Sequence, residues 1–237
     1  MGGLKIRRRM LPLLGLAAGI RPAAADTVDL ALTCDTTLAS VLRRAGAAYT
    51  ARTSVRVFVF PTGPGLILPQ LQRDIQNDIL VTRVTTLEQA MQQDLVAYAS
   101  VSRWRNRLVI AGLDGASAFD QTLAIPDPNP ASAIDGQYVL NRLGMKPARV
   151  LGAVDTDEVA FLIRQGMAQA GLLYMTDVRA SGLAVINPVP VDVWAPEIYA
   201  ACVTRLAQRP NPQRLLAFLA AGDSARLLAD GGLEVQA

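Results

Sequence analysis

The chain has 237 residues, with 23 Lys and Arg, 20 Asp and Glu, two cysteines and no histidine. The lack of histidine excludes a Ser-His-Asp or Cys-His nucleophile and a histidine-based zinc site, and two cysteines do not form a disulfide framework. The sequence also contains no Walker-type or dinucleotide-binding glycine motif. An enzyme built on this chain would have to use carboxylates or a cysteine, and no residue spacing favours that, so we expect no enzyme.

The first 25 residues have the composition of an export signal. Basic residues between positions 5 and 9 precede an apolar run over 10–20, and the small residues Ala23 and Ala25 follow. This pattern predicts a secretory signal peptide that is cleaved after Ala25, exported by the Sec route or, given the run of three arginines, by the twin-arginine route. Because the apolar run is too short to span a bilayer comfortably, we expect a periplasmic protein rather than an anchored one.

The basic character of the whole chain comes from this signal. Residues 1–25 hold five of the 23 basic residues and none of the acidic ones, so the mature chain has 18 basic and 20 acidic residues and a net charge of −2. No polybasic patch remains that would indicate nucleic acid or an anionic membrane as a partner.

Strand and helix patterns alternate through the first half of the mature chain. Short apolar runs predict strands, and apolar residues at helical spacing predict helices. In chain order we expect a strand over 28–32, a helix over 38–50, a strand over 55–60, a turn over 61–65, a helix over 66–73, a strand over 78–82, a helix over 86–93 and a strand over 107–112.

The second half repeats this alternation. It predicts a strand from 122, a helix over 132–143, a strand over 149–154, a helix over 157–165, a strand over 170–174, a proline-punctuated strand within 183–191, a strand over 197–204 and two amphipathic helices over 211–222 and 224–232. Alternating strands and helices predict parallel sheets flanked by helices.

Two consecutive α/β sets predict a two-lobed α/β fold with a cleft between the lobes. We expect residues 26–112 and 193–237 to form lobe 1 and residues 113–192 to form lobe 2. Ligands of open α/β sheets bind beyond the carboxyl ends of the strands. The segments that follow predicted strands are therefore candidate cleft segments, namely TCDTTL at 33–38, PTGPG at 61–65, DPNPASAI at 127–134, VDTDE at 154–158, and Tyr174.

The segment TCDTTL supplies a thiol, a carboxylate and three hydroxyls where a strand leads into a helix. Thr36 or Thr37 suits the helix N-cap, which needs no ligand, whereas free amides and a hydroxyl at a helix start can also bind an anion. Asp35 either caps a turn or points into the cleft. Cys34 and Cys202 are expected to be two separate core residues, although a bridge between them stays open.

The order of several short motifs resembles the periplasmic molybdate-binding proteins, the receptors of molybdate and tungstate ABC importers. Thr37-Leu38, the turn after VFVF, NDILVT, NRLVIA, AIPDP and AGLLYMTDV match the family's segments in sequence order. The resemblance implies a type II periplasmic binding protein that acts as a monomeric receptor: it binds an oxyanion without a cofactor or metal cation and delivers it to an inner-membrane ABC permease.

The resemblance also implies the ligand-binding residues. Carried over by position, they are Thr37, Thr62, Gly63, Ser132, Thr156 and Tyr174. Such a site holds a tetrahedral dianion with neutral hydroxyl and amide dipoles and without a counter-charge.

Three residues depart from the family pattern and are candidates for altered specificity. Pro64 lacks an N–H donor unless Thr62 replaces it, Asp35 stands where relatives have a small neutral residue, and Cys34 adjoins Asp35. A carboxylate close to a dianion is strongly repulsive. An inward Asp35 would therefore suit a cationic or other small polar solute better, and an extracytoplasmic sensor or accessory protein without a transport role is a further alternative.

Overall fold

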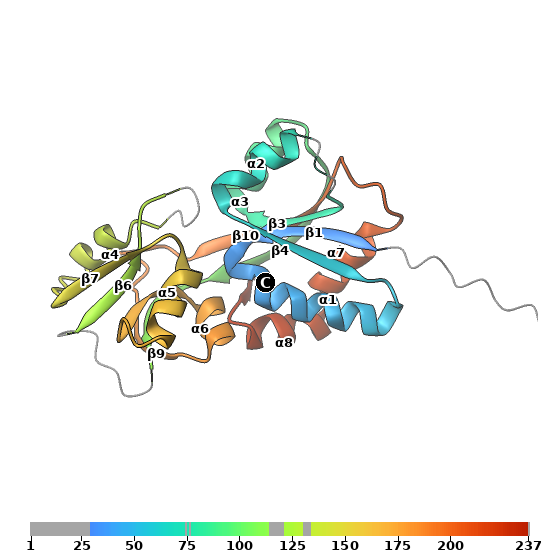
Figure 1. Ribbon diagram of the computed structural model, residues 1–237. Coiled ribbons are helices and arrows are strands. Elements are labelled where there is room, and N and C mark those ends of the chain that lie inside the picture. The colour runs from blue at the N-terminus through green and yellow to red at the C-terminus, as the bar shows by residue number, and fades with distance from the viewer. Residues whose placement is uncertain (1–28, 74, 76, 114–120, 130–133, 237) are drawn as a thin grey trace, which may run out of the picture.

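The computed structural model describes residues 29–73, 75, 77–113, 121–129 and 134–236. Its two β-sheets, each flanked by helices, form the two-lobed α/β fold that the alternating pattern predicts (Figure 1). The predicted signal peptide, its cleavage site and Ser132 lie outside the described residues.

Lobe 1 is built on the six-stranded sheet. Its spatial order is β11-β4-β10-β3-β1-β2, in which β1, β2 and β3 are mutually parallel while β10 runs antiparallel to both β3 and β4. The strands are β1 (Leu30–Asp35), β2 (Val57–Thr62), β3 (Ile79–Arg83), β4 (Val96–Asn106), β10 (Glu197–Thr204) and β11 (Glu234–Gln236).

Lobe 2 is built on the five-stranded sheet. Its order is β7-β6-β8-β5-β9, with β6, β7 and β8 parallel and β5 antiparallel to its neighbours. The strands are β5 (Leu108–Gly112), β6 (Thr122–Pro126), β7 (Arg149–Ala153), β8 (Ala170–Tyr174) and β9 (Ala184–Pro188). Parallel strands buried by helices on both faces explain the continuous apolar runs of β6 and β8.

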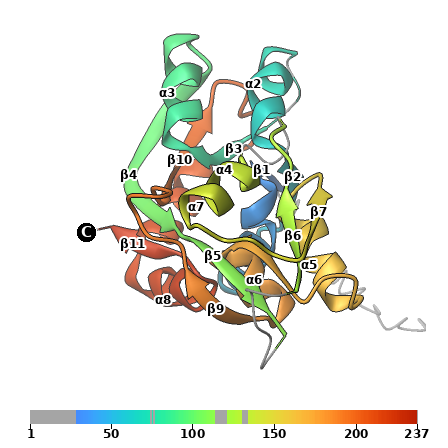
Figure 2. The ribbon, with the colours of Figure 1, turned by 90° about the vertical axis from the view of Figure 1, so that its left-hand side faces the viewer.

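Helices cover both faces of each sheet (Figures 1 and 2). In lobe 1 they are the 3-10 turn η1 (Thr36–Leu38) and the helices α1 (Ala39–Thr53), α2 (Pro64–Gln72), α3 (Val84–Gln92), α7 (Pro212–Ala220) and α8 (Gly222–Asp230). In lobe 2 they are α4 (Gly136–Arg142), α5 (Thr156–Arg164) and α6 (Met175–Ser181). In Figure 1, α2 and α3 lie above the lobe 1 sheet, whereas α1 and α8 lie below it.

The chain crosses between the sheets twice. It passes from β4 to β5 at Arg107, and it returns from β9 to β10 over residues 189–196. The predicted boundary after Gly112 is wrong, because β5 pairs with β8 and β9 in the lobe 2 sheet. The apolar pattern of RLVIAG identified a strand but carried no information on which sheet it joins.

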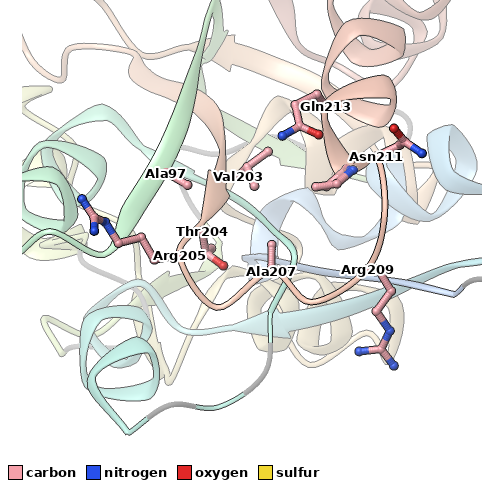
Figure 3. A pocket seen from close by; sticks show the side chains of 9 residues that line it. Ala97, Val203, Thr204, Arg205, Ala207, Arg209, Asn211 and Gln213 are labelled. Carbon is pink, nitrogen blue, oxygen red and sulfur yellow. The ribbon is translucent and has the colours of Figure 1, made fainter.

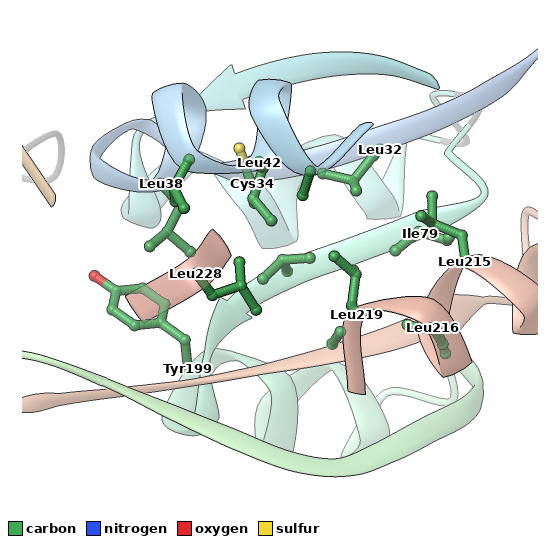
Figure 4. Packing of buried hydrophobic residues seen from close by; sticks show 14 of the residues in the cluster. Leu32, Cys34, Leu38, Leu42, Ile79, Tyr199, Leu215, Leu216, Leu219 and Leu228 are labelled. Atoms are coloured by element: carbon green, nitrogen blue, oxygen red, sulfur yellow. The ribbon is translucent and has the colours of Figure 1, made fainter. Parts of the chain in front are cut away.

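The lobe 1 core lies on both faces of its sheet. Leucines of β1, α1, α7 and α8 pack together below the sheet (Figure 4), and each buried leucine side chain contributes about 1.5–3 kcal/mol through its removal from water. Cys34 belongs to this cluster, whereas Cys202 belongs to the cluster beneath α2 and α3. The two thiols are free and buried, which confirms the expectation of separate core residues.

A glycine allows α5 to approach the lobe 2 sheet. A Cβ atom on Gly171 of β8 would lie 2.4 Å from Val159 Cγ1 of α5 and 2.6 Å from the Ala124 carbonyl oxygen of β6. These distances are too short for a side chain, so Gly171 permits the close helix-to-sheet packing that places the start of α5 beside η1 of lobe 1.

Candidate functional site

The carboxyl ends of β1, β2 and β3 bring three polar side chains to one edge of the lobe 1 sheet. Asp35 ends β1, Thr62 ends β2 beside it in register, and Arg83 ends β3. Beyond this edge η1 contacts α5 and α6 of lobe 2. The candidate site therefore lies where the two lobes meet, at the end of the strands where open α/β sheets bind ligands.

Asp35 is the most buried charged group of this edge, with 1% of its surface exposed. Its Oδ1 accepts a hydrogen bond from Thr82 Oγ1 at 2.8 Å, and its Oδ2 lies 3.3 Å from Arg83 Nε. Burial raises the pKa of the Asp35 carboxyl to about 6, although Arg83 and Thr82 oppose the shift. Asp35 thus neither caps a turn nor stands as an isolated charge in a cleft, because an arginine and a hydroxyl hold it.

Arg83 connects Asp35 to the first residue of β10. Its Nε lies 3.6 Å from Glu197 Oε2, so one guanidinium contacts two carboxylates. Burial alone would lower the pKa of Arg83, but Tyr199, Tyr174 and the two carboxylates raise it by more. The pKa therefore lies above the usual arginine value, and the guanidinium stays charged. The cluster of Asp35, Arg83 and Glu197 carries a net charge of −1 when all three ionise.

Two fully buried tyrosines complete this cluster. Tyr174, at the end of β8 in lobe 2, donates its hydroxyl to Glu197 Oε1 at 3.5 Å, and the hydroxyls of Tyr199 and Thr37 lie 3.3 Å apart. Burial raises the pKa of both phenols, so both remain protonated hydrogen-bond donors at neutral pH. The Tyr174–Glu197 hydrogen bond joins lobe 2 directly to the β10 strand of lobe 1.

On the lobe 2 side, the polar groups surround Asp177. This buried carboxyl accepts the amide of Tyr174 at 3.1 Å and a hydrogen bond from the side chain of Thr156. Its pKa is raised well above the usual value, first by burial and then by Asp157. Thr156 begins α5, whose N-cap residue Asp155 accepts the Glu158 amide at 2.9 Å.

The structure brings part of the predicted ligand set together. Thr37 and Tyr174 reach one polar cluster from different lobes, and Thr156 joins Tyr174 through Asp177. Thr62 donates to Gln70 Oε1 at 3.2 Å and so turns toward α2 within its own lobe. The role of these residues in ligand binding stays a prediction, and that of Ser132 as well, since Ser132 lies outside the described residues.

One local expectation, the helix cap, needs correction. Neither Thr36 nor Thr37 caps a helix, because both lie inside η1 and the hydroxyl of Thr37 meets Tyr199 instead. Pro64 is the first residue of α2, after the N-cap Gly63. Proline suits this position because the first amide of a helix has no partner within the helix, so the missing donor does not weaken the helix.

Sequence reasoning missed Arg83, Glu197 and Tyr199. The expected strand over 78–82 stopped one residue before Arg83, and Glu197 was read only as the start of another strand. A charged residue that closes a buried apolar strand was the signal available for Arg83, since such a residue must find a partner at the sheet edge.

A cavity of about 380 Å³ adjoins this cluster. Its lining includes Arg83 and Glu197 themselves, together with residues from the start of α3, from β4 and from the start of β10. A volume of this size falls within the range of small-molecule pockets, about 300–1,000 Å³.

A second cavity, of about 570 Å³, lies at the opposite edge of the same sheet (Figure 3). It is formed around the end of β10 and the start of α7, and the side chains of Arg205 and Arg209 extend outward from it (Figure 3). Arg205 is paired with Asp94, and the amide of Arg209 donates to Asp78 Oδ1 at 3.3 Å. This cavity lies at the other end of β10 from Glu197, and the described residues that line it all belong to lobe 1.

Comparison with protein families decides the class of the chain. Residues 30–234 match the family described as bacterial extracellular solute-binding protein. The matched range includes strands of both sheets. The chain belongs to this family. Its members bind solutes and are not enzymes, so this solute-binding protein acts outside the cytoplasm as a binder of a small molecule. A search among curated proteins found no significant match.

Solved structures share the fold of this solute-binding protein at low sequence identity. The periplasmic molybdate-binding protein of Azotobacter vinelandii is 14% identical, with a TM-score of 0.73 over 88% of this chain and 100% of that one. The substrate-binding domain of a putative molybdenum ABC transporter from Clostridium difficile is 16% identical, with a TM-score of 0.64 over 87% and 98%.

A third similar structure contains bound phosphate. The putative phosphate ABC transporter substrate-binding protein from Clostridium perfringens, solved with bound phosphate, is 8% identical, with a TM-score of 0.62 over 88% of this chain and 100% of that one. At these identities the comparisons show a common fold and do not identify the ligand. The ligand of this solute-binding protein must be inferred from its own residues.

Two further observations concern the described residues. Among them, no helix is long and apolar enough to cross a membrane. Within the same part of the chain, no group of three or more His, Cys, Asp or Glu residues is arranged to hold a metal ion.

Proposed function

We propose that this solute-binding protein is the periplasmic receptor of an ABC importer and binds a small oxyanion between its lobes. A tetrahedral oxyanion such as molybdate or tungstate is the first candidate. The observation that carries the proposal is that Thr37 of lobe 1 and Tyr174 of lobe 2 reach the same buried polar cluster. Each hydroxyl belongs to a different lobe, and each would donate to the anion in place of its present partner, Tyr199 for Thr37 and Glu197 for Tyr174.

Contacts from both lobes to one ligand would provide the transport mechanism. A ligand that hydrogen-bonds to Thr37 and Tyr174 together stabilises the closed arrangement relative to an open one. An inner-membrane permease then recognises the closed receptor. The two crossings, at Arg107 and over residues 189–196, are the segments about which the lobes would move.

Arg83 adds a feature that the predicted neutral site lacked. Its guanidinium can offset the charge of an anion, although it is shared between Asp35 and Glu197. These two carboxylates favour a second candidate ligand, a small polar solute that carries a cationic group, because a nearby carboxylate repels a dianion and attracts a cation.

Isothermal titration of residues 26–237 with molybdate, tungstate, sulfate and phosphate tests the proposal. We expect saturable binding of at least one anion, and we expect Thr37→Ala and Tyr174→Phe each to weaken it about tenfold or more, the effect of losing one hydrogen bond to a charged ligand. Tyr98→Phe is the matched control, since Tyr98 is an exposed tyrosine of β4.

The outcomes separate the candidate ligands. A folded protein that binds none of the four anions would overturn the oxyanion proposal. Thermal-shift screening of amine-bearing solutes would then test the second candidate. Anion binding that neither Thr37→Ala nor Tyr174→Phe weakens would place the ligand outside the cluster.

A further inference from the structure

The cavity beside the polar cluster contains a balanced set of charges. Four charged side chains line its wall, two positive and two negative: Arg83, Arg103, Glu88 and Glu197. They come from four elements: Arg83 ends β3, Glu88 belongs to α3, Arg103 to β4, and Glu197 begins β10. A site for a bare dianion would not place two carboxylates against the ligand, because each repels it.

The cavity shares two lining residues with the polar cluster of the proposed ligand site. Arg83 and Glu197 line the cavity, and the same two residues contact each other at 3.6 Å inside the cluster. Arg83 has only 9% of its surface exposed, and the phenol that donates to Glu197 is fully buried. A solute in the cavity would therefore meet two side chains that Asp35 and Tyr174 hold in position.

Three of the lining residues suit an anionic group. Arg83 and Arg103 supply two guanidinium groups, and Thr85 adds a hydroxyl in the first turn of α3. The N-cap of α3 makes no side-chain capping hydrogen bond, so the first amides of this nine-residue helix add partial positive charge.

Two other lining residues suit a cationic group. Glu88 follows Thr85 by three positions on α3 and so lies on the same face of the helix. With Glu197 it gives two carboxylates for an ammonium group. The lining also includes the apolar residues Val84, Pro196 and Ile198, which suit a short carbon chain.

We propose that this cavity binds a small organic zwitterion, with its anionic group at Arg83 and Arg103 and its ammonium group at Glu88 and Glu197. The inference rests on the proposed receptor function and names the class of solute, a compound with one anionic and one cationic group joined by a short carbon chain. Neutral pairing of ligand and wall charges avoids the repulsion that two carboxylates impose on a dianion.

Matched ligand pairs test the inference by isothermal titration of residues 26–237. O-Phosphoethanolamine is compared with ethyl phosphate, and β-alanine with propionate, so that each pair differs by an ammonium group. In at least one pair we expect the ammonium-bearing compound to bind about tenfold tighter or more, the value of one charged hydrogen bond.

Glu88→Gln supplies the second arm. The variant should weaken binding of the ammonium-bearing compound about tenfold and leave the affinity for its matched partner compound unchanged. The amide keeps the size of the side chain and removes its charge. Asp223→Asn is the control, since it removes an exposed carboxylate of α8 that is paired with Arg52 and lies outside the cavity lining.

The results separate this inference from the proposed function. Equal affinities within both pairs, including no binding by any of the four compounds, overturn the zwitterion. So does a preference that Glu88→Gln leaves intact. If molybdate, tungstate or phosphate binds while no ammonium preference is found, the oxyanion receptor stands and the zwitterion fails. If a zwitterion binds and no inorganic anion does, the zwitterion stands and the oxyanion proposal fails.

Discussion

The carboxyl edges of the two sheets differ in charge. In lobe 1, the strands β1 and β3 end in Asp35 and Arg83, which form an ion pair. In lobe 2, β6, β7 and β8 end in Pro126, Ala153 and Tyr174, none of which is charged at neutral pH. The strand ends of lobe 2 are therefore uncharged, as expected for an oxyanion site of neutral dipoles, whereas those of lobe 1 carry an ion pair.

The largest effect is expected from breaking the lobe 1 edge with Arg83→Ala. Removal of the guanidinium leaves the buried Asp35 without its cation, and loss of one partner of a buried ion pair costs about 3–5 kcal/mol. Urea denaturation at pH 8 should show this loss in the free energy of unfolding. At pH 5 the loss should be smaller, because a protonated Asp35 needs no cation. An equal loss at both pH values would contradict the role of the pair.

The second effect concerns the titration of Asp35. Its pKa is about 6 in the folded chain and 3.8 ordinarily, so between these values the folded state holds a proton that the unfolded state has released. Stability from this group is therefore full below pH 4 and falls as the pH rises to 6, by about 3 kcal/mol.

Comparison with Asp35→Asn isolates the pH-dependent contribution of Asp35 to stability. The wild type and the variant should differ in the pH slope of the unfolding free energy between pH 4 and 6, with the variant lacking the fall. The raised pKa of Asp177 acts in the same direction in both proteins and cancels in the difference. Parallel pH profiles would show that Asp35 does not titrate in this range.

A smaller effect is expected where the lobes are joined. Tyr174→Phe removes the hydroxyl that donates to Glu197 and should lower the unfolding free energy by about 1 kcal/mol, the net value of one hydrogen bond. Tyr199→Phe, which loses its contact with Thr37 inside lobe 1, should cost a similar amount. Chemical denaturation of both variants checks this, and a loss far larger in one of them would contradict the similarity.

The smallest effect is expected at the surface of lobe 1, away from both edges. Arg52 and Asp223 form an exposed ion pair at 3.0 Å. Asp223→Asn should change the unfolding free energy by less than about 0.5 kcal/mol, because solvent and salt screen such pairs. A loss comparable to that of Arg83→Ala would remove the contrast between the buried and the exposed ion pair.

The sequence was sufficient for the fold and for part of the site. Alternating apolar runs and helical patterns predicted the two α/β lobes, because strand and helix periods are local properties. They could not tell that β5 pairs in the second sheet, since strand pairing depends on contacts far apart in the chain. The long strand β4 lies where no element was predicted, in a stretch with serine and arginine among its apolar residues.

The site shows the same limit. Position along the chain nominated Thr37, Thr156 and Tyr174, each just beyond or at a strand end. It could not reveal that Asp35 pairs with Arg83 or that Tyr174 donates to Glu197, because these contacts join residues separated by 23 or more positions and depend on how the sheets meet.

The central claim is that one ligand contacts both lobes, and a distance measurement across the cleft tests it most directly. Nitroxide labels at Gln89→Cys of α3 and Gln137→Cys of α4 would report the separation of the lobes by pulsed electron resonance, and the native thiols are buried and should stay unlabelled. With a saturating anion that binds in calorimetry, the account predicts a shorter and narrower distance distribution. An unchanged distribution at saturation would contradict it, because the ligand would then bind to one lobe alone.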